Sequence, residues 1–217
     1  MGPRFDELTL REFIDKLSSD EPVPGGGSAS AVAASLGAGL VAMVAALSAN
    51  RPRYEAHAAL HARVGPAGRE LAHRLLQLAS DDAAAYAAYG ETRKLPKEAD
   101  ADVATRERAI AEAARQAAEV PLAVVEACLE LVSLAESLAG RSNANASSDL
   151  NVAALLGEAA ARGAAENVLV NLPSVGDESY ASETTARVVG LLNDVERLAS
   201  ATSEAVQSGD ARDALPG

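Results

Sequence analysis

The sequence predicts an all-α protein built as one bundle of long, alanine-rich helices. Hydrophobic residues make up 48% of the 217 residues and aromatic residues only 3%. The apolar side chains are therefore mostly small, and small side chains let helices approach closely. Sustained strand-like alternation and β-branched runs are almost absent. No internal repeat or linker-like segment divides the chain, so residues 1–217 are expected to form a single domain.

The first predicted helices are a short one and a long, uncharged one. The short helix covers about residues 8–19, and Thr9 has the side chain of an N-cap residue. The second covers about 27–50 and is expected to lie buried at the centre, because no ionisable side chain occurs between Glu21 and Arg51. Its length would allow a membrane span, but its Ala, Ser and Gly content favours a soluble, cytoplasmic protein without a membrane partner.

Two long helices with internal prolines are expected next. The first covers about 54–90, and the Gly-Pro-Ala-Gly segment at 65–68 should kink or break it. The second covers about 102–139, with a bend at Pro121, and Gly140 is suited to its C-terminal end.

The remaining elements complete the predicted bundle. A polar connector over 141–148 leads to a helix that ends near residue 171, before Pro173. The last helix covers about 180–207, and the tail that ends in Gly217 is expected to fray.

The net charge and the residues that could bind a metal ion exclude several classes of function. A net charge of −12 argues against nucleic acid as a partner, since phosphate contacts need a basic surface. Cys128 lies in an apolar helical stretch and is expected to be a buried hydrophobic residue. His57 and His61 are four residues apart, but no further ligand lies at a suitable spacing, so no metal site is expected.

The glycine turn before the uncharged helix has two interpretations. Ser28 is a strong N-cap type, and Gly25, Gly26 and Gly27 permit unusual backbone conformations before it. The same helix start could cradle an anionic ligand, because free N–H groups and the helix dipole point there. The turn is therefore either a helix cap or a ligand cradle.

Asp82 occupies an apolar stripe where leucine would be expected. The stripe steps by three or four residues through Leu71, Leu75, Leu78, Asp82, Ala85 and Tyr89. A buried carboxylate must be paired, hydrogen-bonded or protonated. Asp82 is therefore either half of a structural ion pair or an acid/base group in a cavity.

Amide and charged side chains form further candidates. Asn145 and Asp149 share a helical face, and Asn143 lies just before them. These side chains could either cap a helix or hold the ring of a ligand with hydrogen-bond donors and acceptors. Asn167 and Asn171 are one turn apart and belong either to a core network or to a ligand site. The arginines between residues 51 and 74 form either a solvated helix face or a patch that attracts anions.

Seven segments, in order, resemble the cyclodeaminase/cyclohydrolase family. This family includes the C-terminal domain of formiminotransferase-cyclodeaminase and stand-alone bacterial methenyltetrahydrofolate cyclohydrolases. The matching segments are Pro24–Ala31, Leu40–Val44, Asp81–Tyr86, Leu95–Lys97, Glu119–Leu122, Asn143–Asp149, and Asn167 with Asn171–Leu172. The segment 65–68 and Ser142 depart from the family pattern and could reshape the pocket.

The resemblance implies an up-and-down bundle that forms homodimers and handles one-carbon units on tetrahydrofolate, without a metal or further cofactor. It makes Asp82, Lys97 and Asp149 the expected catalytic residues, although Lys97 alone would be taken as a surface lysine. The expected substrate-binding residues are Gly26, Gly27, Ser28, Asn143, Asn145 and Asn167.

Three functions agree with these residues. The first is hydrolysis of 5,10-methenyltetrahydrofolate to 10-formyltetrahydrofolate, favoured because no formiminotransferase segment is fused to the chain. The second is the formimidoyltetrahydrofolate cyclodeaminase reaction, which releases ammonia. The third is a non-catalytic folate-binding or scaffold bundle.

Overall fold

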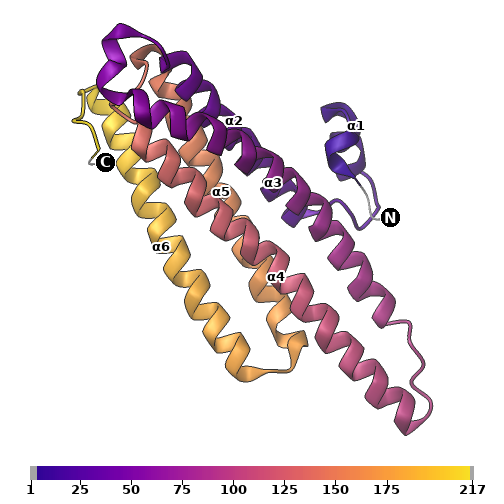
Figure 1. Cartoon of the computed structure of the whole chain (residues 1–217). Helices are drawn as coiled ribbons and strands as arrows, with labels where there is room; N and C mark the ends of the chain where they lie inside the picture. Colours follow the sequence, from indigo (N-terminus) through magenta and orange to yellow (C-terminus); the bar gives the residue numbers. More distant parts are fainter. Residues whose placement is uncertain (1–3, 216–217) are drawn as a thin grey trace.

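The structure, a computed structural model, describes residues 4–215, and this range consists of helices without a strand (Figure 1). The five long helices run up and down beside one another, which confirms the all-α bundle. The α-helices are α1 (Leu10–Leu17), α2 (Gly26–Ser48), α3 (Ala58–Thr92), α4 (Asp100–Leu138), α5 (Ser147–Asn171) and α6 (Glu178–Ser208). Short 3₁₀ helices cover Phe5–Glu7, Pro52–His57, Ala144–Ala146 and Leu172–Val175.

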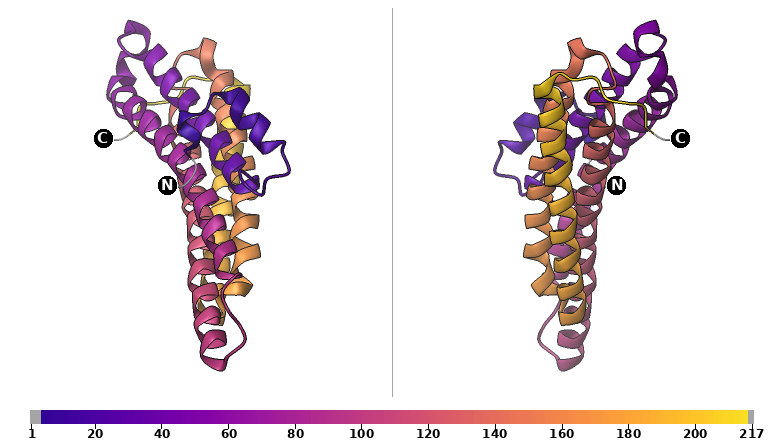
Figure 2. Two further views of the ribbon diagram at one scale, coloured as in Figure 1. Left: turned by 90° about the vertical axis from the view of Figure 1, so that its right-hand side faces the viewer. Right: turned by 90° about the vertical axis from the view of Figure 1, so that its left-hand side faces the viewer.

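The bundle is organised around contacts of α2 with α3 and of α4 with α5. Helix α2 also packs along α5, and α6 covers α4 and α5. Helix α1 lies at the edge of the bundle, on the side opposite α6 (Figure 2), and its buried Phe13 packs against Phe5. Leucines from three long helices, among them Leu71, Leu131 and Leu150, are almost fully buried in the common core.

Several helix ends agree with the sequence. Thr9 and Glu12 form a capping box at the start of α1. Gly140 follows α4 with a φ of +72°, a conformation that glycine adopts without strain. In the tail, Arg212 donates its backbone N–H to the Gly140 carbonyl at 2.9 Å and pairs with Glu136. The last two residues of the tail, 216 and 217, lie outside the described range.

The break expected at residues 65–68 does not occur, because α3 continues through Pro66 from Ala58 to Thr92. Gly68 has a different role, which is to let α2 approach. A Cβ at Gly68 would lie 3.1 Å from both the Ala38 carbonyl oxygen and the Ala42 nitrogen. The close packing of α2 against α3 therefore accounts for this glycine.

Helix α4 likewise continues through Pro121. Proline has no N–H, so the carbonyl of Ala117, one turn earlier, lacks its helical donor. Asn171 of α5 replaces that donor, with its Nδ2 at 2.9 Å from the Ala117 oxygen. Asn171 thus belongs to a core network, one of the two alternatives left open by the sequence.

Replacing Asn171 with alanine should destabilise the protein by about 1–3 kcal/mol, because the buried Ala117 carbonyl loses its donor. The loss should shrink in a Pro121→Ala background, since a backbone N–H at position 121 can then donate to Ala117. Denaturant unfolding of the wild type, both single variants and the double variant measures this coupling. Equal losses in the two backgrounds would contradict it.

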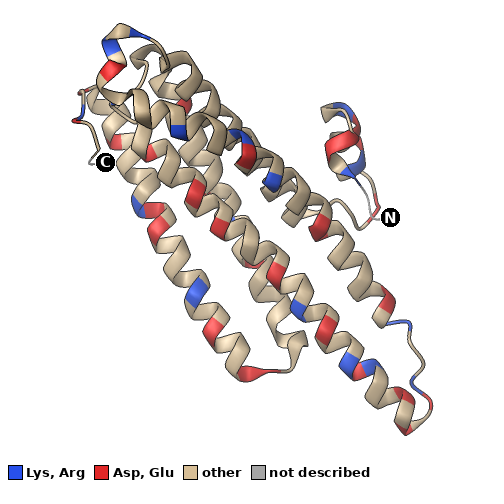
Figure 3. Ribbon diagram, viewed as in Figure 1, with Lys and Arg blue, Asp and Glu red and all other residues tan. Residues whose placement is uncertain are grey.

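Helix α2 is less buried than the sequence suggested. One face packs into the core, but Leu36 is 57%, Met43 39% and Leu47 40% exposed. By length and composition α2 could cross a membrane, although half of it is buried in the bundle, as in the core helix of many proteins. Figure 3 shows that α2 carries no charged residue, unlike the other long helices.

Candidate active site

The glycine turn and Asp82 meet at the N-terminal end of α2. Gly25 is the N-cap residue and makes no side-chain cap bond, so the expectation that Ser28 caps the helix is wrong. Ser28 lies inside the first turn of α2 and is fully buried. Its Oγ donates a 2.9 Å hydrogen bond to Asp82 Oδ2, which links α2 to α3.

Gly27 lets the Asp82 carboxyl group reach α2. A Cβ at Gly27 would lie 2.7 Å from both Cγ and Oδ2 of Asp82, closer than real Cβ contacts. Any larger residue would therefore displace the carboxyl group. The glycine is needed for this contact rather than for a special backbone conformation, because Gly27 is helical and has no positive φ.

Asp82 has no basic partner within residues 4–215, so the structural ion pair considered for it is not formed. Burial raises the pKa of Asp82 above its ordinary value, and the hydrogen bond from Ser28 only partly opposes this shift. A carboxyl group whose pKa is moved toward neutrality is suited to exchanging protons with a ligand. Asp82 thus has the properties of an acid/base group.

A cavity of about 220 Å³ opens beside Asp82. It brings together four of the predicted site residues, Gly26, Gly27, Asp82 and Asn167, with Ser28 directly behind Asp82. The full lining is Pro22, Val23, Gly25, Gly26, Gly27, Asp82, Tyr86, Ala117, Asn167 and Asn171.

Six lining residues were not among the predicted site residues, and two of them, Tyr86 and Asn171, have polar side chains. Tyr86 lies one helical turn after Asp82 and is 53% exposed, so the i, i+4 spacing could have identified it. Asn171 lines the cavity while its amide group bonds the Ala117 carbonyl. Asn167 likewise donates to a backbone carbonyl, that of Gly163, at 2.8 Å.

The second predicted cluster lies at the opposite end of α2. Asn143 is buried and donates its backbone N–H to Ser48 Oγ at 2.8 Å. Its Oδ1 accepts the N–H of Asn145, so Asn143 caps the 3₁₀ helix that precedes α5. Asn145 is exposed and Asp149 half-buried.

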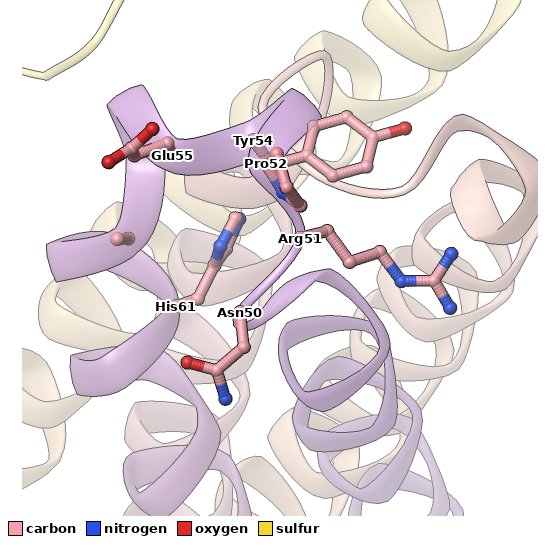
Figure 4. A pocket seen from close by; sticks show the side chains of 7 residues that line it. Asn50, Arg51, Pro52, Tyr54, Glu55 and His61 are labelled. Atoms are coloured by element: carbon pink, nitrogen blue, oxygen red, sulfur yellow. The ribbon is translucent and has the colours of Figure 1, made fainter.

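One copy of the chain does not bring these two clusters together. Ser28 contacts Asp82 of the first cluster and Ser48 contacts Asn143 of the second. The twenty residues of α2 from Ser28 to Ser48 span about 30 Å. The second end has a cavity of its own, about 340 Å³, between the 3₁₀ helix 52–57 and the end of α2 (Figure 4). The Arg51 side chain in this region points away from Glu55 (Figure 4).

Lys97 does not contact Asp82 in this structure. It is exposed in the loop between α3 and α4, where its backbone N–H donates to Glu98. Ten residues of α3, about 15 Å of helix, separate Asp82 from the end of α3 at Thr92.

The histidines and the cysteine contribute no metal site. His61 is buried, with Nε2 at 2.9 Å from the Arg141 carbonyl oxygen, and burial lowers the pKa of His57. Burial also raises the pKa of the Cys128 thiol to about 12, in agreement with its expected place in the core. Within residues 4–215, no three His, Cys, Asp or Glu side chains are grouped so that they could hold a metal ion.

Comparison with known proteins identifies the family. Residues 9–189 match the family model described as formiminotransferase-cyclodeaminase. The chain belongs to this family. Family membership confirms the resemblance drawn from the ordered sequence segments.

Two relatives differ in how much of their length the chain matches. The methenyltetrahydrofolate cyclohydrolase of Methylorubrum extorquens is 36% identical over 200 residues, which are 92% of this chain and 96% of that protein. The formimidoyltransferase-cyclodeaminase of Sus scrofa is 34% identical over 93% of this chain. The chain spans only 37% of that longer protein.

A solved structure has the same fold. The crystal structure of formiminotetrahydrofolate cyclodeaminase from Thermotoga maritima superposes with a TM-score of 0.85 and 26% sequence identity. The similarity covers 94% of this chain and 98% of that chain. The bundle described above is therefore the fold of the family.

Proposed function

We propose that this protein is a methenyltetrahydrofolate cyclohydrolase. The observation that carries the proposal is the end-to-end match with the cyclohydrolase of Methylorubrum extorquens, which covers 92% of this chain and 96% of that protein. The Asp82 cavity supports it, because hydrolysis of a cationic ring needs a carboxylate and a route for water.

Asp82 has two tasks in this reaction. Its carboxylate stabilises the cationic methenyl carbon and accepts a proton from the attacking water, whose oxygen bonds to that carbon. The bond from the carbon to N5 then breaks, N5 takes a proton, and the formyl group stays on N10. One proton is released overall. Ser28 holds the carboxyl group in position through its hydrogen bond.

Three predicted residues beside Asp82 have binding roles. Gly26, Gly27 and Asn167 line the cavity and contact the ring system. Asn143 and Asn145, predicted to bind substrate, and Asp149, predicted to be catalytic, lie at the opposite end of α2 from Asp82, so these roles stay predictions. Arginines near Arg51 attract the anionic glutamate tail. The reaction needs no metal and no cofactor beyond the tetrahydrofolate substrate.

A second candidate is the cyclodeaminase reaction. The similarity to formiminotetrahydrofolate cyclodeaminase from Thermotoga maritima, which spans both chains, favours it. In this reaction N10 attacks the formimino carbon, and the leaving nitrogen takes a proton and departs as ammonia. A protonated Asp82 could supply that proton, whereas Lys97 could do so only if its loop moved toward the cavity.

The proposed function also comes with an expected compartment, oligomeric state and set of partners. We expect a cytoplasmic homodimer whose partner is a folate, with no nucleic acid and no membrane among its partners. The net charge of −12 supports the exclusion of nucleic acid, because phosphate contacts need a basic surface.

Absorbance of the methenyl chromophore tests the proposal with purified protein. Loss of the chromophore from 5,10-methenyltetrahydrofolate, faster than in buffer, is the expected result. Its formation from 5-formiminotetrahydrofolate, with release of ammonia, would assign the cyclodeaminase reaction instead. Tight folate binding without turnover of either substrate would contradict both and identify a non-catalytic folate-binding bundle.

A further inference from the structure

Asn171 gives the Asp82 cavity a second acceptor of fixed orientation. Its Nδ2 lies 2.9 Å from the Ala117 carbonyl oxygen and 2.8 Å from the Asn167 carbonyl oxygen. Carbonyl oxygens only accept hydrogen bonds, so both N–H groups of the amide are used and the orientation of the amide is settled. Asn171 can therefore offer the cavity an oxygen but no further donor.

Pro121 is the cause of this orientation. Proline leaves the Ala117 carbonyl of α4 without its helical donor, and the amide nitrogen of Asn171 supplies one. The nitrogen thus belongs to the core network. The oxygen accepts no hydrogen bond within residues 4–215, and it is not one of the buried polar atoms in this range that lack a partner, so a ligand can reach it.

The other polar side chains of the cavity are held less firmly. The amide of Asn167 makes a single hydrogen bond, to a backbone carbonyl, so one of its N–H groups stays available. Tyr86 is 53% exposed, and its hydroxyl group forms no hydrogen bond within residues 4–215. Asp82 and Asn171 are therefore the two acceptors of the cavity whose direction is set by contacts within the fold.

Attack by water benefits from two such acceptors. A water molecule that donates both of its hydrogens directs a lone pair of its oxygen away from the two acceptors and toward the atom that it attacks. The cavity, about 220 Å³, has room for water beside the reacting end of a substrate. Among the described residues no lysine or arginine lines it, so no fixed cation competes for either acceptor.

We infer that Asn171 orients the attacking water, which donates one hydrogen to Asp82 and the other to Oδ1 of Asn171. This inference rests on the proposed function. As the water oxygen bonds to the methenyl carbon, one proton moves to Asp82 and the second hydrogen stays on the new hydroxyl group. When the bond from the carbon to N5 breaks, Asp82 passes its proton to N5 and the hydroxyl proton is released, which leaves the formyl group on N10.

Hydrogen exchange tests the fixed acceptor without using activity. Both side-chain N–H protons of Asn171 should exchange with water about ten-fold more slowly than those of Asn145, which is exposed and whose side-chain amide donates to no group within residues 4–215. NMR of the isotope-labelled wild type measures both rates, and Asn171→Ala and Asn145→Ala assign the signals. Equal rates would overturn the fixed orientation.

Asn171→Ala in a Pro121→Ala background tests the role of the oxygen. In this background the N–H of residue 121 donates to Ala117, so the substitution removes the acceptor without leaving a buried carbonyl unpaired. Relative to Pro121→Ala alone, kcat with 5,10-methenyltetrahydrofolate should fall about ten-fold or more, because the water loses its direction. KM should change by less than about two-fold, because the amide contacts the water rather than the folate.

Asn151→Ala in the same background is the matched control. Asn151 also lies in α5, but its Oδ1 accepts a hydrogen bond from the Ser203 hydroxyl group at 2.6 Å and it does not line the cavity, so kcat should stay unchanged. An unchanged kcat after loss of Asn171, or an effect confined to KM, would overturn the inference. A wild type that turned over no methenyl substrate would refute the proposed function, while the exchange rates would still decide the orientation of Asn171.

Discussion

Asp82→Asn should reduce turnover by about 10²–10⁴-fold and leave the bundle intact, because it removes a positioned acid/base group and hardly changes side-chain volume. Steady-state rates with 5,10-methenyltetrahydrofolate measure the first effect, and thermal unfolding measures the second. Asp81→Asn is the matched control: Asp81 accepts a hydrogen bond from Gln77 and does not line the cavity. It should retain wild-type turnover.

The raised pKa of Asp82 also fixes the direction of the pH effects. Wild-type turnover should fall on the acid side, with a midpoint above the ordinary pKa of an aspartate, because the protonated carboxyl group cannot accept a proton from water. Because burial raises the pKa of Asp82 in the folded state, this carboxyl group stabilises the fold most when it is protonated, below its unfolded-state pKa. The stabilisation is lost as the pH rises through the folded-state pKa.

At neutral pH the buried, charged Asp82 therefore weakens the fold. Asp82→Asn should unfold at the same temperature as the wild type or higher when both are measured at neutral pH, with the advantage disappearing in acid. Unchanged turnover would refute the catalytic role. A large drop in melting temperature at neutral pH would instead mean that the carboxylate stabilises the bundle.

Gly27→Ala should lower kcat/KM by about 10²-fold, because the new Cβ would lie 2.7 Å from Asp82 Cγ and force the carboxyl group out of position. The hydrogen bond from Ser28 should be lost at the same time. Stability should change little, since alanine gains about 0.5–1 kcal/mol of helix propensity over glycine and offsets part of the strain.

Gly190→Ala is the control for this substitution. Gly190 lies in α6, and no neighbouring atom lies within 4 Å of the position that its new methyl group would occupy, so the change should leave kcat/KM unaltered. If Gly27→Ala were fully active, the close approach of Asp82 to α2 would be irrelevant to catalysis. If it failed to fold, the glycine would be a packing requirement only.

Local patterns predicted the features that depend on neighbouring residues. The Thr9–Glu12 capping box and the Gly140 helix end were readable because each involves residues within one turn. Asp82 was identifiable because its stripe is otherwise apolar. The partners of Ser28 and Asn171 were not, since each hydrogen bond joins residues more than fifty positions apart.

The sequence by itself determined the helical class, the order of the helices and the family, because periodicity, small side chains and ordered motifs are properties of the chain alone. Only the tertiary structure decided that the helix through Pro66 stays whole, that Ser28 serves Asp82 rather than the helix end, and that one face of α2 is uncovered. These outcomes depend on which helices pack together, and packing is set by contacts between distant residues.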